Sequence, residues 1–156
     1  MFKRILSVNE IMEEMSIFLF GARQTGKSTY LKNAFPNAMY IDLLDASVRR
    51  IYKNQPSVLY DQLVGSNTST VIIDEITEVP DLLNEVHRLT FKTDIRFVIC
   101  ASSARKLRRK GANTLGGRAF PCYLYPLVSA EIPELDIDRA INVGMIPTHY
   151  LSKRPQ

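Results

Sequence analysis

The stretch FLFGARQTGKSTYL, residues 18–31, decides the fold of this 156-residue chain. The apolar run at residues 16–20 is typical of a strand buried on both faces. A loop bounded by glycines follows at residues 21–26. Residues 27–35 then have the pattern of a helix, which Pro36 ends. We therefore expect a buried strand that turns through a glycine loop directly into a helix.

The loop matches the pattern G-x4-G-K-[ST] at every position, which indicates a phosphate-binding loop. Glycine permits backbone torsions that direct successive N–H groups at one anion, and the next helix adds its own unpaired N–H groups and positive dipole end. Lys27 would reach the β- and γ-phosphates of a nucleotide, Ser28 would ligate Mg²⁺, and Thr29 would bond the α-phosphate. A chance glycine turn is the alternative, and average residue usage produces the pattern in on the order of one such chain in a few hundred. The predicted nucleotide-binding residues are Gly21, Ala22, Arg23, Gln24, Thr25, Gly26, Lys27, Ser28 and Thr29.

A second predicted site lies in the sequence VIIDE, residues 71–75, where a buried strand ends in two acids. Mg²⁺ bound beside a phosphate loop needs an acidic partner, and Asp74 would supply it. Glu75 would orient or deprotonate the attacking water. Two exposed acids at a strand end are common and alone are only moderate evidence of a metal site. They become strong evidence here because a complete phosphate-binding loop precedes them in the sequence.

The remaining pattern alternates between strands and helices. Apolar runs predict further strands at residues 38–44, 95–101 and 120–127. Helical spacing appears at residues 46–64, with a break at Pro56, and at residues 80–91. Such alternation predicts an α/β domain with a mainly parallel sheet. The N-terminal segment favours a short amphipathic helix, whereas the part after residue 131 has three prolines and weak periodicity.

Composition is that of an ordinary globular protein, with 46% hydrophobic and 23% charged residues and a net charge of +4. We expect Cys100 and Cys122, each inside an apolar run, to be buried thiols. No apolar run approaches the roughly 18 to 20 residues that span a bilayer, and acidic residues interrupt any signal-peptide core. These features predict a cytoplasmic protein with no membrane partner.

With these residues placed, the chain resembles a bacterial and archaeal family of AAA-like P-loop ATPases, whose usual members carry an additional C-terminal domain of uncharacterised function. The resemblance covers about residues 17–131 and is carried by GARQTGKST, YIDLLD, VIIDEITEVPDLLNEVHRL, RFVICASSARKLRRKGANTLGGRA and YPLVSAE. It implies a three-layer α/β fold of the AAA-like P-loop type, whose mainly parallel five-stranded sheet has the strand order 5-1-4-3-2. It also implies a polar sensor for the γ-phosphate at Ser102 or Ser103, for which an ordinary helix cap is the alternative.

This chain departs from the family pattern at several positions. Ala22 replaces a common proline, Thr77 replaces a common glutamine, and Cys100 and Ala101 replace a usual Thr-Gly pair. Residues 131–156 correspond to the start of a lid or second domain. We therefore expect an ATPase domain at residues 1–130 followed by a C-terminal tail, acting alone, as a homo-oligomer or with a partner chain.

A basic cluster follows the fourth predicted strand. Its residues are Arg105, Lys106, Arg108, Arg109, Lys110 and Arg118. The first interpretation is a solvated face. The second is a nucleotide or subunit contact, in which Arg118 acts as an arginine finger. The third is a nucleic-acid surface, although no aromatic residue occurs from Ala101 to Ala119 to stack on bases.

The sequence thus predicts an ATPase that binds ATP and Mg²⁺, with Lys27, Asp74, Glu75, Ser102 and Arg118 in catalytic roles. A kinase-like transferase is one alternative, because the same loop serves both chemistries. A non-catalytic, nucleotide-dependent interaction module or truncated remnant is the other.

Overall fold

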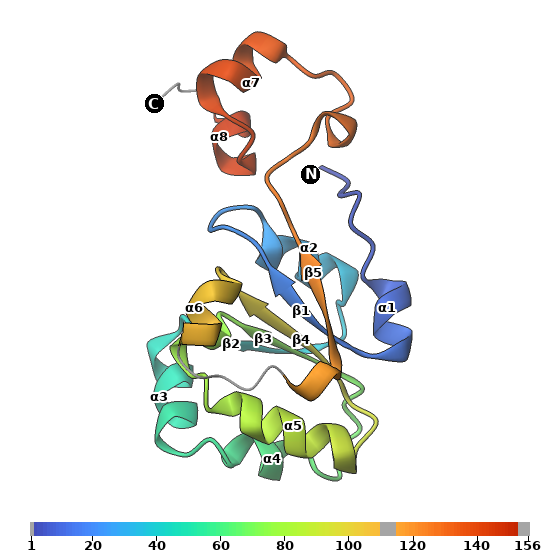
Figure 1. The fold of residues 1–156 in the computed structure, drawn as a ribbon, viewed down its shortest axis with the longest axis vertical. Helices are drawn as coiled ribbons and strands as arrows, with labels where there is room; N and C mark the ends of the chain where they lie inside the picture. Colours follow the sequence, from blue (N-terminus) through green and yellow to red (C-terminus); the bar gives the residue numbers. More distant parts are fainter. Residues whose placement is uncertain (1, 110–114, 153–156) are drawn as a thin grey trace.

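The computed structural model describes residues 2–109 and 115–152, and it contains a five-stranded sheet between two layers of helices (Figure 1). The strand order is β2-β3-β4-β1-β5 and every pairing is parallel, which confirms the predicted order read from the opposite edge. The strands are β1 (Ser16–Phe20), β2 (Met39–Asp42), β3 (Thr70–Asp74), β4 (Arg96–Ala101) and β5 (Ala119–Tyr123). The helices are α1 (Asn9–Glu14), α2 (Lys27–Ala34), α3 (Ala46–Asn54), α4 (Val58–Leu63), α5 (Leu82–Lys92), α6 (Ala104–Arg109), α7 (Ile137–Val143) and α8 (Pro147–Leu151), with short 3₁₀ turns η1 (Ile76–Glu78), η2 (Leu115–Gly117) and η3 (Ser129–Glu131).

Strand β1 is buried at all five positions because it lies between β4 and β5 with helices on both faces. Ile17 and Leu19 face the layer formed by α1 and α2. Phe18 and Phe20 stack on each other and face the layer that contains α3, α4, α5 and α6. Alternating side chains of a strand point to opposite faces, so this uninterrupted apolar run fills two cores at once.

The helices cover the sheet through apolar stripes. Helix α5 buries Leu82, Leu83, Val86 and Leu89 on one side, as the helical spacing predicts. It begins at Leu82, two residues after the expected start. Helix α3 begins after Asp45, whose side chain accepts hydrogen bonds from the N–H groups of Ser47 and Val48.

The C-terminal segment forms structure that weak periodicity did not predict. After β5, which ends at Tyr123 and not at residue 127, the chain passes η3 and forms α7 and α8. Leu127, Ile132 and Tyr150 are the buried centre of this part, and Phe2 packs against them. Figure 1 shows α7 and α8 beyond the end of the sheet at which α2 begins, and the N-terminal segment runs toward the same part of the molecule. Within residues 2–109 and 115–152, no helix is long and apolar enough to cross a membrane.

Candidate functional site

The loop between β1 and α2 requires glycine at two positions for different reasons. A Cβ on Gly21 would lie 2.4 Å from the backbone oxygen of Leu124, so the close approach of the residue that follows β5 excludes any side chain there. Gly26 has a φ of +89°, in the left-handed region that favours glycine. Gln24 also has a positive φ, +65°, without being glycine. From the sequence motif we expected both positions to need glycine for its backbone torsions. The structure confirms this for Gly26, whereas Gly21 is required because a side chain would overlap the Leu124 backbone.

Lys27 turns back over the loop. Its Nζ donates to the carbonyl oxygens of Gly21 at 2.7 Å and Ala22 at 3.0 Å, and the residue is only 8% exposed. The Thr25 hydroxyl donates to the Ala22 oxygen at 2.9 Å. The ammonium group therefore lies inside the loop. The other predicted loop residues lie on its solvent side: Ala22, Arg23, Gln24, Ser28 and Thr29 are all exposed.

Ser28 and Asp74, the two predicted magnesium ligands, are in direct contact. The Ser28 Oγ donates to Asp74 Oδ2 at 2.6 Å, although 46 residues separate them. The Tyr40 hydroxyl donates to the same carboxylate oxygen. Burial raises the pKa of Tyr40, and its hydrogen bond to Asp74 raises it further, so the phenol stays a donor. Sequence reasoning missed Tyr40, which occupies an ordinary strand position on β2.

A hydroxyl and a carboxylate are oxygen donors of the kind that Mg²⁺ prefers. Among the described residues, no group of three or more His, Cys, Asp or Glu side chains could hold a metal ion. Mg²⁺ at Ser28 and Asp74 would therefore complete its ligands with phosphate oxygens and water. The donor set fits this ion when a nucleotide is present.

Glu75 is held in one orientation directly after β3. Its φ of +56° places a non-glycine residue in the left-handed region, which is a strained conformation typical of functional sites. Glu75 Oε1 accepts from the hydroxyls of Thr77 at 2.5 Å and Ser102 at 3.0 Å, and from the Ser102 N–H at 3.3 Å. Ser102 therefore contacts Glu75, the second member of the acid pair. The Ser103 hydroxyl instead accepts from the Lys106 N–H at 3.3 Å, as a helix cap does.

A cavity of about 430 Å³ opens beside the loop. One side is polar and consists of the end of the loop and the start of α2. The other side is largely apolar and comes from the two ends of the chain, which sequence reasoning did not connect with the site. The lining of the whole cavity includes Gln24, Gly26, Lys27, Ser28, Phe2, Arg4, Tyr30, Leu127, Pro147 and Leu151. Both cysteines are free and buried, as expected, and burial raises the pKa of the Cys100 thiol.

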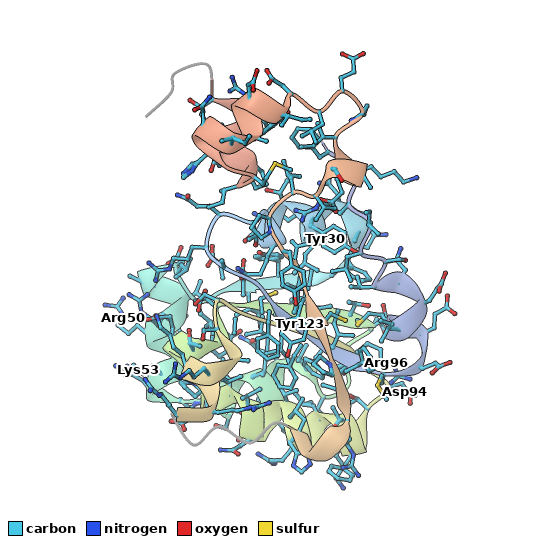
Figure 2. All side chains as sticks on the ribbon, turned by 45° about the horizontal axis from the view of Figure 1, so that its top comes forward. Tyr30, Arg50, Lys53, Asp94, Arg96 and Tyr123 are labelled. Atoms are coloured by element: carbon cyan, nitrogen blue, oxygen red, sulfur yellow. The ribbon has the colours of Figure 1, made fainter. Side chains whose placement is uncertain are left out.

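Arg118 lies far from the phosphate-binding loop of its own chain. It precedes Ala119, which pairs with Ser16 at the start of β1, whereas the loop follows the end of β1. The five residues of β1 separate the two by about 16 Å. The Arg118 guanidinium lies 4.0 Å from the centre of the Phe91 ring. Arg118 lines a shallow pocket with Arg96, which begins β4 and is labelled in Figure 2, so it lies at the end of the sheet where the strands start. A contact from Arg118 to a neighbouring subunit stays a prediction.

The basic side chains of α6 point to solvent. Arg105, Lys106, Arg108 and Arg109 are exposed, while Leu107 is buried beneath them. Lys110 lies outside the described residues. This arrangement fits a solvated face, and nucleic-acid binding by the same residues stays a prediction.

Comparisons with known proteins agree with the fold described above. A family model described as an AAA domain matches residues 13–133, and no curated protein matches the chain. The Walker-type ATPase of Pyrococcus abyssi superposes with a TM-score of 0.59 at 14% identity, over 88% of this chain and 61% of that chain. A structure of two coordinating Pif1 helicases that unwind forked double-stranded DNA superposes with a TM-score of 0.50 at 16% identity, over 90% of this chain and 47% of that chain. The chain thus spans less than two thirds of either protein, and at these identities the likeness is one of fold.

Proposed function

The chain belongs to the AAA domain family, and from this premise we propose that it binds ATP with Mg²⁺ at residues 21–29 and hydrolyses it. One observation carries the proposal. The 2.6 Å contact between Ser28 and Asp74 brings the loop and the acid pair, which are remote in sequence, to one point. A glycine turn formed by chance would have no reason to meet a second acidic site there.

Phosphate binding rests on the loop and the first turn of α2. Unpaired N–H groups at a helix N-terminus bind anions, and the helix dipole favours negative charge there. The Lys27 ammonium now donates to two carbonyl oxygens, and a phosphate would offer it a charged acceptor, which makes a stronger bond. The apolar side of the adjacent cavity, with Phe2, Leu127 and Pro147, would receive the nucleotide base.

Hydrolysis would use the acid pair. Ser28 and Asp74 would hold Mg²⁺, which when bound neutralises charge on the β- and γ-phosphate oxygens. Glu75 would orient a water molecule whose oxygen attacks the γ-phosphorus. The bond from that phosphorus to the β–γ bridging oxygen then breaks, and Glu75 accepts the proton of the water. The donors Thr77 and Ser102 would keep the carboxylate directed at this water.

A second candidate function is nucleotide binding without hydrolysis. Oε1 of Glu75 already accepts three hydrogen bonds, two from Ser102 and one from Thr77, and this favours a resting carboxylate that activates no water. A module of this kind would respond to ATP by changing a contact with a partner chain or a second copy. The two candidates share the binding site and differ only in turnover.

ATP binding and phosphate release by three variants separate the candidates. Lys27→Ala should weaken ATP binding by about tenfold to a hundredfold, because a charged hydrogen bond contributes about 1.5–3 kcal/mol. Glu75→Gln should keep the affinity and lose phosphate release. Lys53→Ala is the matched control, since this exposed lysine lies on α3 and points away from the loop in Figure 2. A wild-type chain that binds ATP but releases no phosphate would favour the binding module, and a chain that binds no ATP would contradict both.

A further inference from the structure

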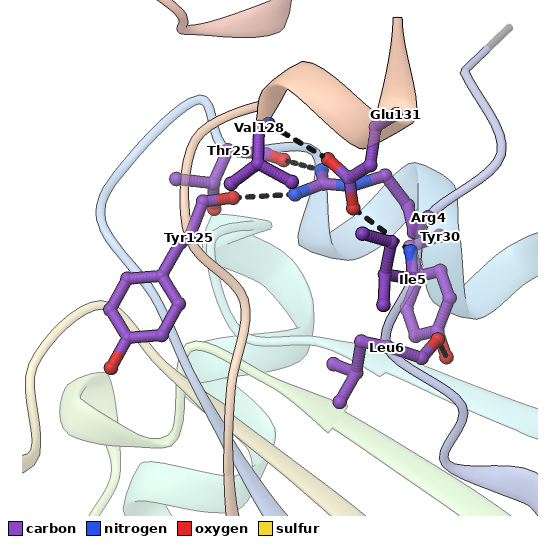
Figure 3. Close-up of polar contacts among 8 residues, drawn as sticks. All are labelled: Arg4, Ile5, Leu6, Thr25, Tyr30, Tyr125, Val128 and Glu131. Carbon is purple, nitrogen blue, oxygen red and sulfur yellow. Dashed lines mark hydrogen bonds and ion pairs between the residues drawn. The ribbon is translucent and has the colours of Figure 1, made fainter.

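Arg4 makes contacts that extend beyond the N-terminal segment to the phosphate loop. Its Nη1 donates to the Thr25 carbonyl oxygen at 2.7 Å, its Nη2 to the Tyr125 carbonyl oxygen at 2.5 Å, and its Nε to Glu131 Oε1 at 3.0 Å. All three guanidinium nitrogens are therefore used, and the side chain is only 7% exposed (Figure 3). We call Arg4, Thr25, Tyr125 and Glu131 the Arg4 cluster.

Glu131 holds Arg4 in place. Its carboxylate also accepts from the N–H groups of Ile5 at 2.9 Å and Val128 at 3.3 Å, and its side chain is 5% exposed. Burial by itself raises the pKa of Glu131, but the Ile5 N–H, the Arg4 guanidinium and the Val128 N–H together hold it below its ordinary value. The carboxylate is thus charged at neutral pH and fixes the orientation of the guanidinium plane.

The bond from Arg4 to Thr25 sets the orientation of one peptide group in the loop. In a trans peptide the carbonyl and the following N–H point in opposite directions. Because the Thr25 oxygen points at Arg4, the Gly26 N–H points away from it, and no described residue accepts a hydrogen bond from that N–H. Gly26 has a left-handed φ, +89°, and glycine adopts positive and negative φ about equally well, so the residue itself does little to fix the orientation of this peptide.

We propose that Arg4 is a positioning residue of the phosphate loop: through the Thr25 carbonyl it keeps the Gly26 N–H directed at the phosphate site. Glu131 and the Tyr125 carbonyl keep the guanidinium in the geometry that this requires. The same side chain connects the loop to residues 125–131, which lead to the apolar side of the cavity. The inference rests on the proposed nucleotide site and assigns a role to a residue outside its motifs.

Amide hydrogen exchange without nucleotide tests the positioning directly. Arg4→Gln should speed exchange at the Gly21 and Tyr30 N–H groups, which donate to the Ala101 and Gly26 oxygens, by about tenfold or more, because a charged hydrogen bond to the loop is lost. Exchange in residues 39–42 should change far less. Lys3→Gln removes an exposed positive charge one position away and should change neither segment. Arg4→Lys keeps the positive charge but lacks the planar guanidinium whose three nitrogens reach three acceptors. Its loop should therefore exchange as fast as that of Arg4→Gln.

ATP titration of the same variants gives the consequence for binding. Arg4→Gln should weaken ATP binding about tenfold or more, and Lys3→Gln should not. If Arg4→Gln fails to fold, Glu131→Gln should still speed exchange at the Gly21 and Tyr30 N–H groups, by a smaller factor. Equal loop exchange in wild type and these variants, or normal exchange in Arg4→Lys, would overturn the role of Arg4. A wild-type chain that binds no ATP would overturn the proposed function, while the exchange measurement would still decide the role of Arg4.

Discussion

Replacing Gly21 by alanine tests the steric explanation of the loop. The new Cβ would lie 2.4 Å from the Leu124 oxygen, 1.0 Å closer than the 3.4 Å at which ordinary van der Waals contact begins. No rotation of a side chain relieves this overlap, because both atoms are fixed by backbone. The Leu124 N–H also donates to the Phe20 oxygen at 2.7 Å, which holds the two segments together. The ends of β1 and β5 must therefore separate.

Overpacking of this kind costs about 3 kcal/mol, the upper part of the usual range, because backbone meets backbone. For a chain of this size the melting temperature should fall by about 6–12 °C. ATP affinity should fall with it, because the loop begins at the displaced residue. Thermal unfolding and calorimetric ATP titration measure the two effects.

Gly65→Ala is the matched control for this substitution. Gly65 has a φ of +77°, and no atom lies within 4 Å of the position that a Cβ would take, so alanine there costs only left-handed strain, about 1 kcal/mol. It should leave ATP affinity unchanged. The reasoning is refuted if Gly21→Ala melts and binds ATP as the wild type does, or if it loses no more stability than Gly65→Ala.

Three further predictions concern the hydrogen bonds of the site. Tyr40→Phe keeps the ring and removes the donor to Asp74, so urea unfolding should show a loss of about 1.5 kcal/mol; unchanged stability would mean that this bond contributes nothing. Ser102→Ala removes one donor to Glu75, so steady-state kinetics should show phosphate release slowed about tenfold at unchanged ATP affinity; a change in affinity alone would contradict this role. The pKa of Glu131 is lower in the folded chain than its ordinary 4.5, so its stabilising contribution is complete above that pH and is lost as the pH falls through the folded value. Urea unfolding from pH 6 to pH 3 should therefore show a wild-type advantage over Glu131→Gln that shrinks on acidification; a constant difference would argue against the shift.

The central strands could be predicted because they are buried on both faces. Such strands form short apolar runs, and the expected bounds of β1, residues 16–20, are those observed. The alternation of strands and helices predicted the parallel sheet, but periodicity does not encode the order of strands. The order came from the family resemblance, and the parallel pairing of β1 with both β4 and β5 confirms it.

Other features have no local signal in the sequence. Arg4 and Glu131 are 127 positions apart. Glu131 ends the family stretch YPLVSAE, but Arg4 lies outside every motif, and nothing local in the sequence links the two. Tyr40 looks like any core aromatic until the sheet places it beside Asp74. Helix α7 has no fully buried residue: Ala140 and Val143 pack only partly against the C-terminal core, and Ile137 and Ile141 are exposed. In seven residues, this gives periodicity little from which to predict the helix. The division into residues 1–130 and a C-terminal unit stays a prediction, as does the cytoplasmic location.

The most direct test of the account is a titration of the ¹⁵N-labelled chain with Mg²⁺ and ATP, followed by the amide signals of residues 21–29. We predict that the signals of Gly26, Lys27 and Ser28 shift most, because their N–H groups gain phosphate acceptors, and that Lys27→Ala removes the shifts at the same ATP concentration. Shifts confined to other parts of the chain, or none at all, would contradict the claim that this loop binds a nucleotide.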